Sequence, residues 1–295
     1  MQYNSRTYHY PVGKQVTIYK KSITRNEKDT VRDFKEEKKE KNEKFTKSYR
    51  NENRTKEQEE HSENVSLSAT KNRIYNIARS NAWEWFITLT FDRDKTDSAD
   101  YDMIVHRIHI FLSNLQKRKC PDLKYLIVPE LHADKEHYHF HGLLSGAENL
   151  RFCFSGHYDQ KGNPVFNIPE WGYGFTTATQ VQDSTKASSY ITKYITKDTE
   201  LKLKNKKRYL CSRNVDRTSP VYGLLDEEAF LNANGKDIVY AKNVKARDID
   251  GKYTRPYSRA PYVFISANYY ELRDKSEGQN EESEENEKNG ENEER

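Results

Sequence analysis

The sequence predicts an α+β fold, in which an antiparallel β-sheet carries helices packed on it. Three observations predict it. Short runs of alternating or continuous apolar residues, typical of strands, lie at 83–91, 122–131, 137–144 and 174–181. Apolar residues with helical spacing lie before and between these runs. Charged residues make up 33% of the chain and gather toward its two ends, which favours one folded region between disordered extensions.

Composition sets the expected domain boundaries. Residues 1–65 contain a short strand or hairpin at 8–20 and then a charged stretch, and we expect them to be largely disordered. Residues 66–273 carry a net charge of +7 and form the folded domain with a C-terminal extension, a balance compatible with nucleic-acid binding. Residues 274–295 carry a net charge of −7 and no apolar side chain, which predicts a disordered acidic tail.

The elements of the folded domain follow from its periodicity. A helical stripe precedes the first strand and consists of Leu67, Ile74, Ile77 and Ala78. Alternation within 83–91 puts Phe86, Thr88 and Thr90 on one face of a central strand. A helix at 97–118 presents one apolar stripe, formed by Ile104, Ile108, Phe111, Leu112 and Leu115.

The remaining elements are two paired strands, one further strand and a last helix. Strands at 122–131 and 137–144 flank a turn at 132–136 and predict a hairpin, after which the chain is turn-rich. A strand at 174–181 leads to a helix at 184–198 that Ser184 or Thr185 could cap. No element is assigned beyond residue 220.

The run "HYHFHGLL" places histidines at alternate positions of one strand. His137, His139 and His141 therefore share a face, while Phe140 anchors the other side. Imidazole and carboxylate groups on rigid elements suit a divalent cation. Glu130 ends the preceding strand and comes alongside His139 and His141 in a hairpin. The alternative ligands are His132, His137, Asp134 and Glu136.

The run "YITKYITK" places Tyr190, Lys193, Tyr194 and Lys197 within an arc of about 100° on one helix face. A tyrosine can act as a covalent nucleophile toward a phosphodiester. Such an attack needs a cation on the phosphate oxygens and positive groups near the developing charge. The histidines and the lysines supply these two requirements together.

The three runs "FITLTF", "HFHGLL" and "YITKYITK", in this order, resemble the motifs of HUH endonucleases. The paired tyrosines are similar to those of two-tyrosine rolling-circle replication initiators from phages, plasmids and integrative elements. The resemblance covers about residues 66–215. It implies an RRM-like nuclease core with the histidines on a central strand. It also implies nicking and rejoining of single-stranded origin DNA through a 5′-phosphotyrosine link.

The resemblance also assigns roles to individual residues. It implies a site for Mg²⁺ or Mn²⁺ at His139, His141 and, more loosely, Glu130. It implies nucleophiles at Tyr190 and Tyr194, accompanied by Lys193 and Lys197.

A basic segment, "LKLKNKKRYLCSR" at 201–213, directly follows the tyrosine helix and contains six Lys or Arg and no acid. Cationic side chains on phosphates give salt-dependent DNA affinity, although a solvated basic loop would have the same composition. The DNA-binding candidates are Lys202, Lys204, Lys206, Lys207, Arg208 and Arg213.

Missing features define the expected partners and location. The chain has no G-x-x-x-x-G-K-[ST] phosphate loop, so a host or element-encoded helicase would unwind the duplex and a separate DNA polymerase would extend the freed 3′ end. No run is apolar enough to span a membrane, no signal peptide is visible, and three scattered cysteines suit a reducing compartment. We therefore expect a cytoplasmic protein with no membrane partner.

Three rival functions remain. Conjugative relaxases place the tyrosine before the histidines, the reverse of the order seen here, and single-tyrosine transposases lack the second tyrosine. A non-catalytic nucleic-acid-binding module would use Phe86 and Phe91 as a stacking platform. Those two residues fall on opposite strand faces.

Overall fold

The computed structural model describes residues 1–24, 56–196, 199, 203, 206–247 and 264–273, with the side chains of 56–62 left aside. The chain divides into two compact units, one formed by residues 50–217 and the other by residues 1–49 with 218–295. Each unit contains an antiparallel sheet and helices, so the predicted α+β class is confirmed. None of the described helices is long and apolar enough to cross a membrane.

The unit of residues 50–217 is built on a seven-stranded sheet with the order β6-β7-β8-β3-β5-β4-β9. The central strand is β3 (Trp85–Phe91), as its alternation predicts. It pairs with β5 (Tyr138–Ser145) on one side and β8 (Gly174–Gln180) on the other. The outer strands are β4 (Lys124–Leu131), β6 (Cys153–Tyr158), β7 (Pro164–Asn167) and β9 (Leu210–Cys211).

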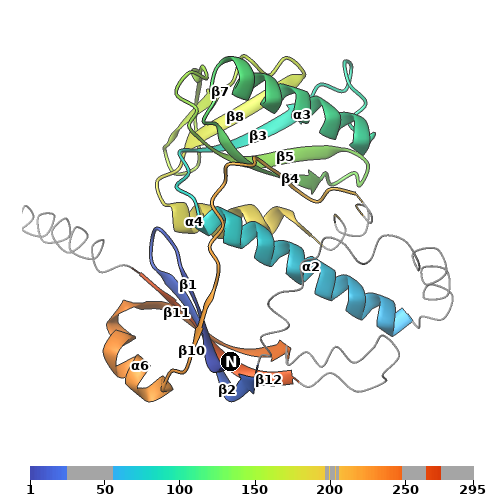
Figure 1. Cartoon of the computed structure of the whole chain (residues 1–295). Coiled ribbons are helices and arrows are strands. Elements are labelled where there is room, and N and C mark those ends of the chain that lie inside the picture. Colours follow the sequence, from blue (N-terminus) through green and yellow to red (C-terminus); the bar gives the residue numbers. More distant parts are fainter. Residues whose placement is uncertain (25–55, 197–198, 200–202, 204–205, 248–263, 274–295) are drawn as a thin grey trace, which may run out of the picture. The chain divides into compact units, whose positions relative to one another are not determined.

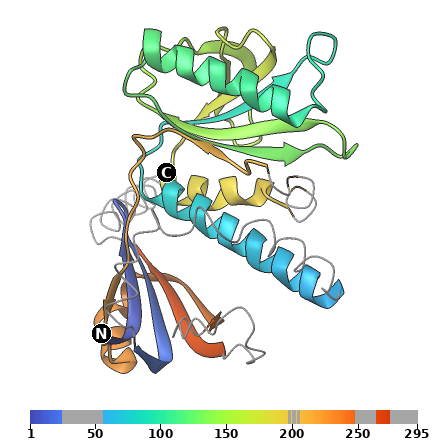
Figure 2. The same cartoon turned by 45° about the vertical axis from the view of Figure 1, so that its right-hand side comes forward.

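Helices cover the two faces of this sheet unequally (Figures 1 and 2). The helix α3 (Tyr101–Arg118) packs its predicted stripe on one face, against Ile87 and Leu89. The other face packs against α2 (Lys56–Arg79) and α4 (Ser184–Ile191) through Leu126, Val128 and Leu143. The sheet is thus the middle layer of three, and each face has its own apolar core.

The last helix of this unit ends earlier than its sequence predicts. The cap of α4 is the Asp183 carboxylate, which accepts from the Lys186 amide, and neither Ser184 nor Thr185 is the N-cap. A short 3₁₀ turn, η2 (Thr192–Tyr194), follows α4, and Ile195 is extended. The cause is local, because β-branched residues crowd this stretch and the Thr192 hydroxyl bonds the Ser189 carbonyl.

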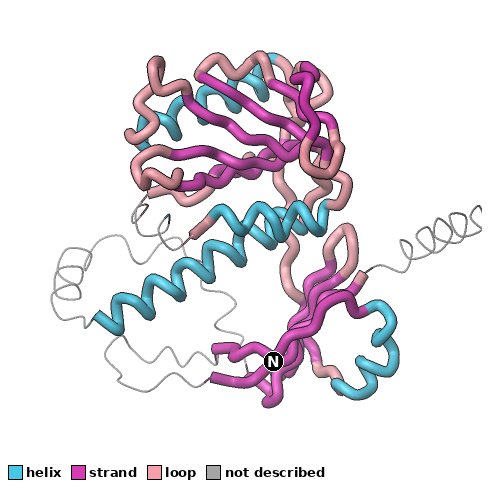
Figure 3. The backbone as a smooth tube through the Cα atoms, turned by 180° about the vertical axis from the view of Figure 1, so that it is seen from behind, coloured by secondary structure: helices cyan, strands magenta, loops and turns pink. Residues whose placement is uncertain are grey.

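Two strands lie in the stretch that the sequence indicates only as turns. Both β6 and β7 carry few buried side chains, so their apolar alternation is weak. They extend the sheet beyond β8 (Figure 3, strands in magenta).

The other unit joins the two ends of the chain in one five-stranded sheet, ordered β10-β1-β2-β12-β11. Its strands are β1 (Gln2–His9), β2 (Lys14–Thr24), β10 (Val221–Gly223), β11 (Ile238–Arg247) and β12 (Phe264–Leu272). The helix α6 (Glu227–Asn234) packs Phe230 on one face, against Val16 and Tyr270.

This division differs from the one that composition suggests. Residues 1–24 are strands that pair with segments after residue 220, so the folded part of the chain does not begin at residue 66. The stretch at 25–55 and the acidic tail at 274–295, both predicted to be disordered, lie outside the described residues.

Candidate active site

The strand β5 carries the two candidate metal ligands between β3 and β4. In register, His139 lies opposite Thr90 and Glu130, and His141 lies opposite Thr88. Side chains at opposite positions of an antiparallel pair share a face. The two imidazoles, both threonines and the carboxylate therefore point to the same side of the sheet.

The opposite face of β5 explains the rest of the motif. Phe140 is buried within the core under α3. A Cβ on Gly142 would lie 2.2 Å from the Ile127 Cδ1 atom and 3.2 Å from the Ile87 Cγ1 atom. Glycine at this position therefore lets β5 pack closely beside both neighbours while the histidines keep their register.

Threonine hydroxyls from β3 hold both imidazoles. The Thr88 Oγ1 atom lies 3.1 Å from His141 Nδ1, and the Thr90 Oγ1 atom lies 3.2 Å from His139 Nδ1. Contacts of this kind fix the ring orientation and aim the Nε2 atoms away from β3. Burial lowers the pKa of both histidines, which favours the neutral imidazole that binds a metal.

The third candidate ligand, Glu130, contacts one of the histidines. Its Oε2 atom lies 2.7 Å from His141 Nε2, a diagonal contact across the β4–β5 pair. The Glu130 carboxylate partly opposes the effect of burial on the His141 pKa. The structure therefore brings His139, His141 and Glu130 together as predicted from the hairpin.

The alternative ligands gather around a different carboxylate. The His132 ring stacks on His139 with centroids 5.1 Å apart. The Nδ1 atoms of His132 and His137 lie 3.1 Å and 2.8 Å from Asp134 Oδ2. The amides of Glu136 and His137 donate to Asp134 and hold the pKa of its carboxyl well below its usual range. His137 lies in the turn before β5 and does not share the strand face of the other two histidines.

These donors match the chemistry of a divalent-cation site only in part. Neutral imidazoles and a carboxylate on adjacent strands are suitable ligands. In the described part of the chain, however, no three His, Cys, Asp or Glu side chains are grouped so that they could hold a metal ion. The His141 imidazole and the Glu130 carboxylate contact one another directly.

The two candidate nucleophiles lie over the same sheet face. The Tyr194 ring stacks on His141 with centroids 3.6 Å apart and an interplanar angle of 16°. Tyr190 contacts Tyr194 at 5.3 Å between centroids, and both rings pack on Phe86. The histidine and tyrosine motifs, about fifty residues apart in the sequence, are therefore in direct contact.

The two tyrosines differ in environment. The Tyr190 side chain is 47% exposed, whereas Tyr194 is half-buried. Burial, together with a hydrogen bond to Tyr190, raises the pKa of Tyr194 well above its usual value. The Lys193 Nζ atom lies 5.4 Å from the centroid of the Tyr190 ring. Lys197 lies outside the described residues, so its predicted place beside the tyrosines has no structural description.

The basic segment after the tyrosines contributes side chains of two kinds. Arg208 donates to the hydroxyls of Ser66 and Thr70, which ties it to α2. Lys206 pairs with Asp102 at 3.0 Å. Lys207 and Arg213 are exposed, which fits DNA contact better. Lys202 and Lys204 fall outside the described residues.

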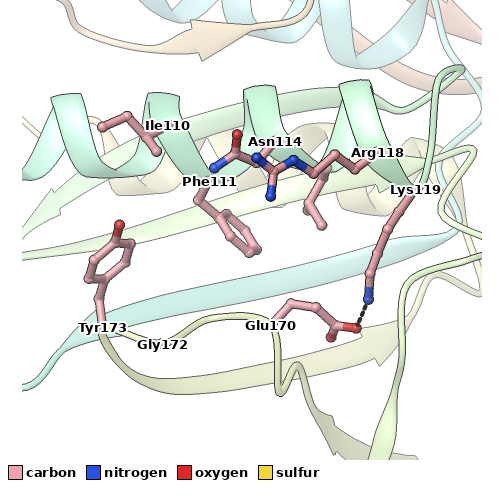
Figure 4. A pocket seen from close by; sticks show the side chains of 9 residues that line it. Ile110, Phe111, Asn114, Arg118, Lys119, Glu170, Gly172 and Tyr173 are labelled. Atoms are coloured by element: carbon pink, nitrogen blue, oxygen red, sulfur yellow. Dashed lines mark hydrogen bonds and ion pairs between the residues drawn. The ribbon is translucent and has the colours of Figure 1, made fainter.

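A separate cavity of about 410 Å³ lies on the α3 side of the sheet (Figure 4). Phe111 and Tyr173 line it, and an ion pair of 2.7 Å between Lys119 and Glu170 closes one end. Because the histidines and tyrosines occupy the other face, this cavity is not part of the candidate site.

Comparison with known proteins identifies one similarity. The model of a family described as replication-associated protein ORF2 matches this chain, and the matched residues are 84–199. They include β3, the histidine strand and both tyrosines. This segment is thus similar to replication-associated proteins, which is consistent with a role in initiating DNA replication. Searches of curated proteins and of solved structures found no match.

The contribution of Thr88 and Thr90 is a finding of the structure. Their alternation places them on one strand face, but the sequence contains no sign that β5 would pair beside them. The face assignment of Phe86 and Phe91 also gains meaning. Phe91 is buried in the α3 core, and Phe86 lies under the tyrosines, so they form no open stacking platform.

Proposed function

We propose that residues 84–199 nick and rejoin single-stranded origin DNA by tyrosine transesterification, and that this reaction starts rolling-circle replication. One observation carries the proposal: the Tyr194 ring stacks on His141, and Tyr190 packs beside it, so the candidate nucleophiles meet the candidate ligands on one face. The similarity of this segment to replication-associated proteins supports it.

His139, His141 and Glu130 are the residues that would hold Mg²⁺ or Mn²⁺. When bound, the ion would withdraw charge from the non-bridging oxygens of the phosphodiester. For Glu130 and His141 to serve as ligands, their direct 2.7 Å contact must give way.

Tyr190 is the first nucleophile in this proposal because its hydroxyl belongs to the more exposed ring. A bond forms between the phenol oxygen and phosphorus, and the bond from phosphorus to the 3′ oxygen breaks. The phenol proton leaves to solvent, and the 3′ oxygen acquires a proton. One ester replaces another, so no nucleotide hydrolysis is required. The Lys193 ammonium lies near enough to Tyr190 to offset the charge that develops on the phosphate.

Tyr194 acts second. Its raised pKa and its hydrogen bond to Tyr190 keep it protonated while Tyr190 is free. Once Tyr190 carries the DNA end, that hydrogen bond is lost and Tyr194 can attack the regenerated junction. One chain could then hold the old 5′ end and cut the new one, with unwinding and synthesis left to a separate helicase and polymerase.

The test is covalent capture. The full chain is incubated with Mn²⁺ and a 3′-labelled pool of random single-stranded DNA, and adducts are separated on a denaturing gel. We expect an adduct with the wild type, a reduced adduct with Tyr190→Phe or Tyr194→Phe, and none with the double variant.

A matched control is Tyr173→Phe, which removes a phenol from the cavity on the other face and should form the adduct as the wild type does. If the wild type binds the DNA without forming an adduct, the chain is a non-catalytic binding module. If Tyr194→Phe cleaves and rejoins as the wild type does, the enzyme works with a single tyrosine, as transposase-like relatives do.

A further inference from the structure

The sheet face that carries the candidate site continues beyond the histidines onto β8. The registers of three strand pairs align Glu130, His139, Thr90 and Phe175 in one row across the sheet. Residues directly opposite each other share a face, so the Phe175 ring lies on the side of the imidazoles. Two strand spacings separate Phe175 from His139, a distance of about 10 Å between backbones.

This part of the face is open. Phe175 is 73% exposed, and no large apolar side chain among the described residues is more exposed. Thr177, the next residue of β8 on the same face, is also exposed. By contrast, His141 is 7% exposed, because Tyr194 stacks on it. The covered half of the face holds the candidate chemistry, and the uncovered half presents a bare phenyl ring.

The backbone around Phe175 is held firmly. The Trp171 indole donates to the Thr90 carbonyl at 3.1 Å, and the Asp92 amide donates to the Tyr173 carbonyl at 2.8 Å. A Cβ on Gly174 would lie 2.3 Å from the Thr90 carbonyl oxygen, so the two strands approach as closely as backbones allow. A ring on such a support keeps a fixed distance from the histidine strand.

We propose that Phe175 is a nucleobase-stacking subsite for single-stranded DNA, which holds a base next to the phosphate that reaches the tyrosines. The proposal rests on the proposed function in one respect, because that function assigns a DNA strand to this face. An aromatic ring stacks on a base of any sequence, since every base has a π-face. A rigid ring about 10 Å from His139 would set which phosphate of a bound strand faces Tyr190.

Other exposed aromatic residues do not share this position. Phe154 is 51% exposed on β6, but the register through Phe166 and Ala178 places it on the opposite face of the sheet. It therefore provides a matched control, an exposed phenyl ring on the same sheet that a strand at the candidate site would not contact.

Binding is measured without metal, by fluorescence anisotropy of the full chain with a labelled oligodeoxythymidylate of about 16 nucleotides. Phe175→Ala should weaken binding by about 5- to 100-fold, whereas Phe175→Trp should retain it. The slope of log affinity against log salt should stay unchanged, because no charge is removed. Phe154→Ala should bind as the wild type does.

An abasic oligonucleotide of the same length distinguishes stacking from other causes. The wild type and Phe175→Ala should bind it equally, since it has no base to stack. Wild-type affinity of Phe175→Ala for the thymidylate strand, or an equal loss on the abasic strand, would overturn the proposal. Failure of nicking is seen separately, as a missing covalent adduct in the presence of Mn²⁺, and would leave a Phe175-dependent affinity standing.

Discussion

Replacing Thr88 by valine tests the link between β3 and the candidate metal ligands. Valine has the shape and strand preference of threonine but lacks the hydroxyl that lies 3.1 Å from His141 Nδ1. A hydrogen bond of this kind contributes about 0.5–1.5 kcal/mol, and loss of a partner that orients a ligand typically lowers metal affinity about 10- to 100-fold. Few waters can replace the hydroxyl, because His141 is buried.

We therefore expect Thr88→Val to weaken Mn²⁺ binding by at least about tenfold, which corresponds to about 1.4 kcal/mol. Thr90→Val should have a smaller effect, because His139 is more exposed than His141 and water can replace the lost contact. Isothermal titration calorimetry with Mn²⁺ in the absence of DNA measures both effects. The Mn²⁺ concentration that half-saturates adduct formation provides a second readout.

The matched control is Thr177→Val. Thr177 lies opposite Thr88 on the same face of the sheet but is exposed on β8, on the side of β3 away from the histidines. It should leave Mn²⁺ affinity unchanged. Unaltered Mn²⁺ binding in both Thr88→Val and Thr90→Val would refute the reasoning that these hydroxyls orient the imidazoles.

Three further predictions concern packing, pH and salt. Gly142→Ala should lower the free energy of unfolding by about 1–3 kcal/mol in urea titrations, since its Cβ would meet Ile127 at 2.2 Å. Gly172→Ala has no neighbouring atom within 4 Å and should leave stability almost unchanged. Burial raises the pKa of Glu227, but hydrogen bonds from Lys20, Asn268 and Tyr270 outweigh it and hold the pKa at about 2. Stability from this depressed pKa is present above about pH 4.3 and is lost as pH falls toward 2, so Glu227→Gln should remove about 1–2 kcal/mol of acid sensitivity from thermal unfolding curves. Identical pH profiles would contradict it. Charge neutralisation at Lys207 or Arg213, both exposed, should reduce the salt dependence of DNA binding by a slope of about 1 each. An unchanged slope would make residues 201–213 a solvated loop.

The sequence by itself determined the features that depend on local periodicity. Alternation placed Thr88 and Thr90 on one face of β3, and the spacing of Ile104 and Ile108 identified the buried stripe of α3. The helix of the tyrosine motif was predicted too long, because β-branched residues and the Thr192 hydroxyl end it locally. These features are readable because neighbouring residues on a strand or helix have fixed directions.

Only the tertiary structure decided which strands become neighbours. Pairing of β5 beside β3 brings the threonine hydroxyls to the imidazoles, and pairing of β8 on the other side brings Phe175 into the same row. The strands of residues 2–24 pair with segments more than two hundred residues later, which no local pattern indicates. A strand's own sequence specifies the faces of its side chains, but its partner and register depend on the burial and hydrogen bonding of distant segments that compete for the same edge.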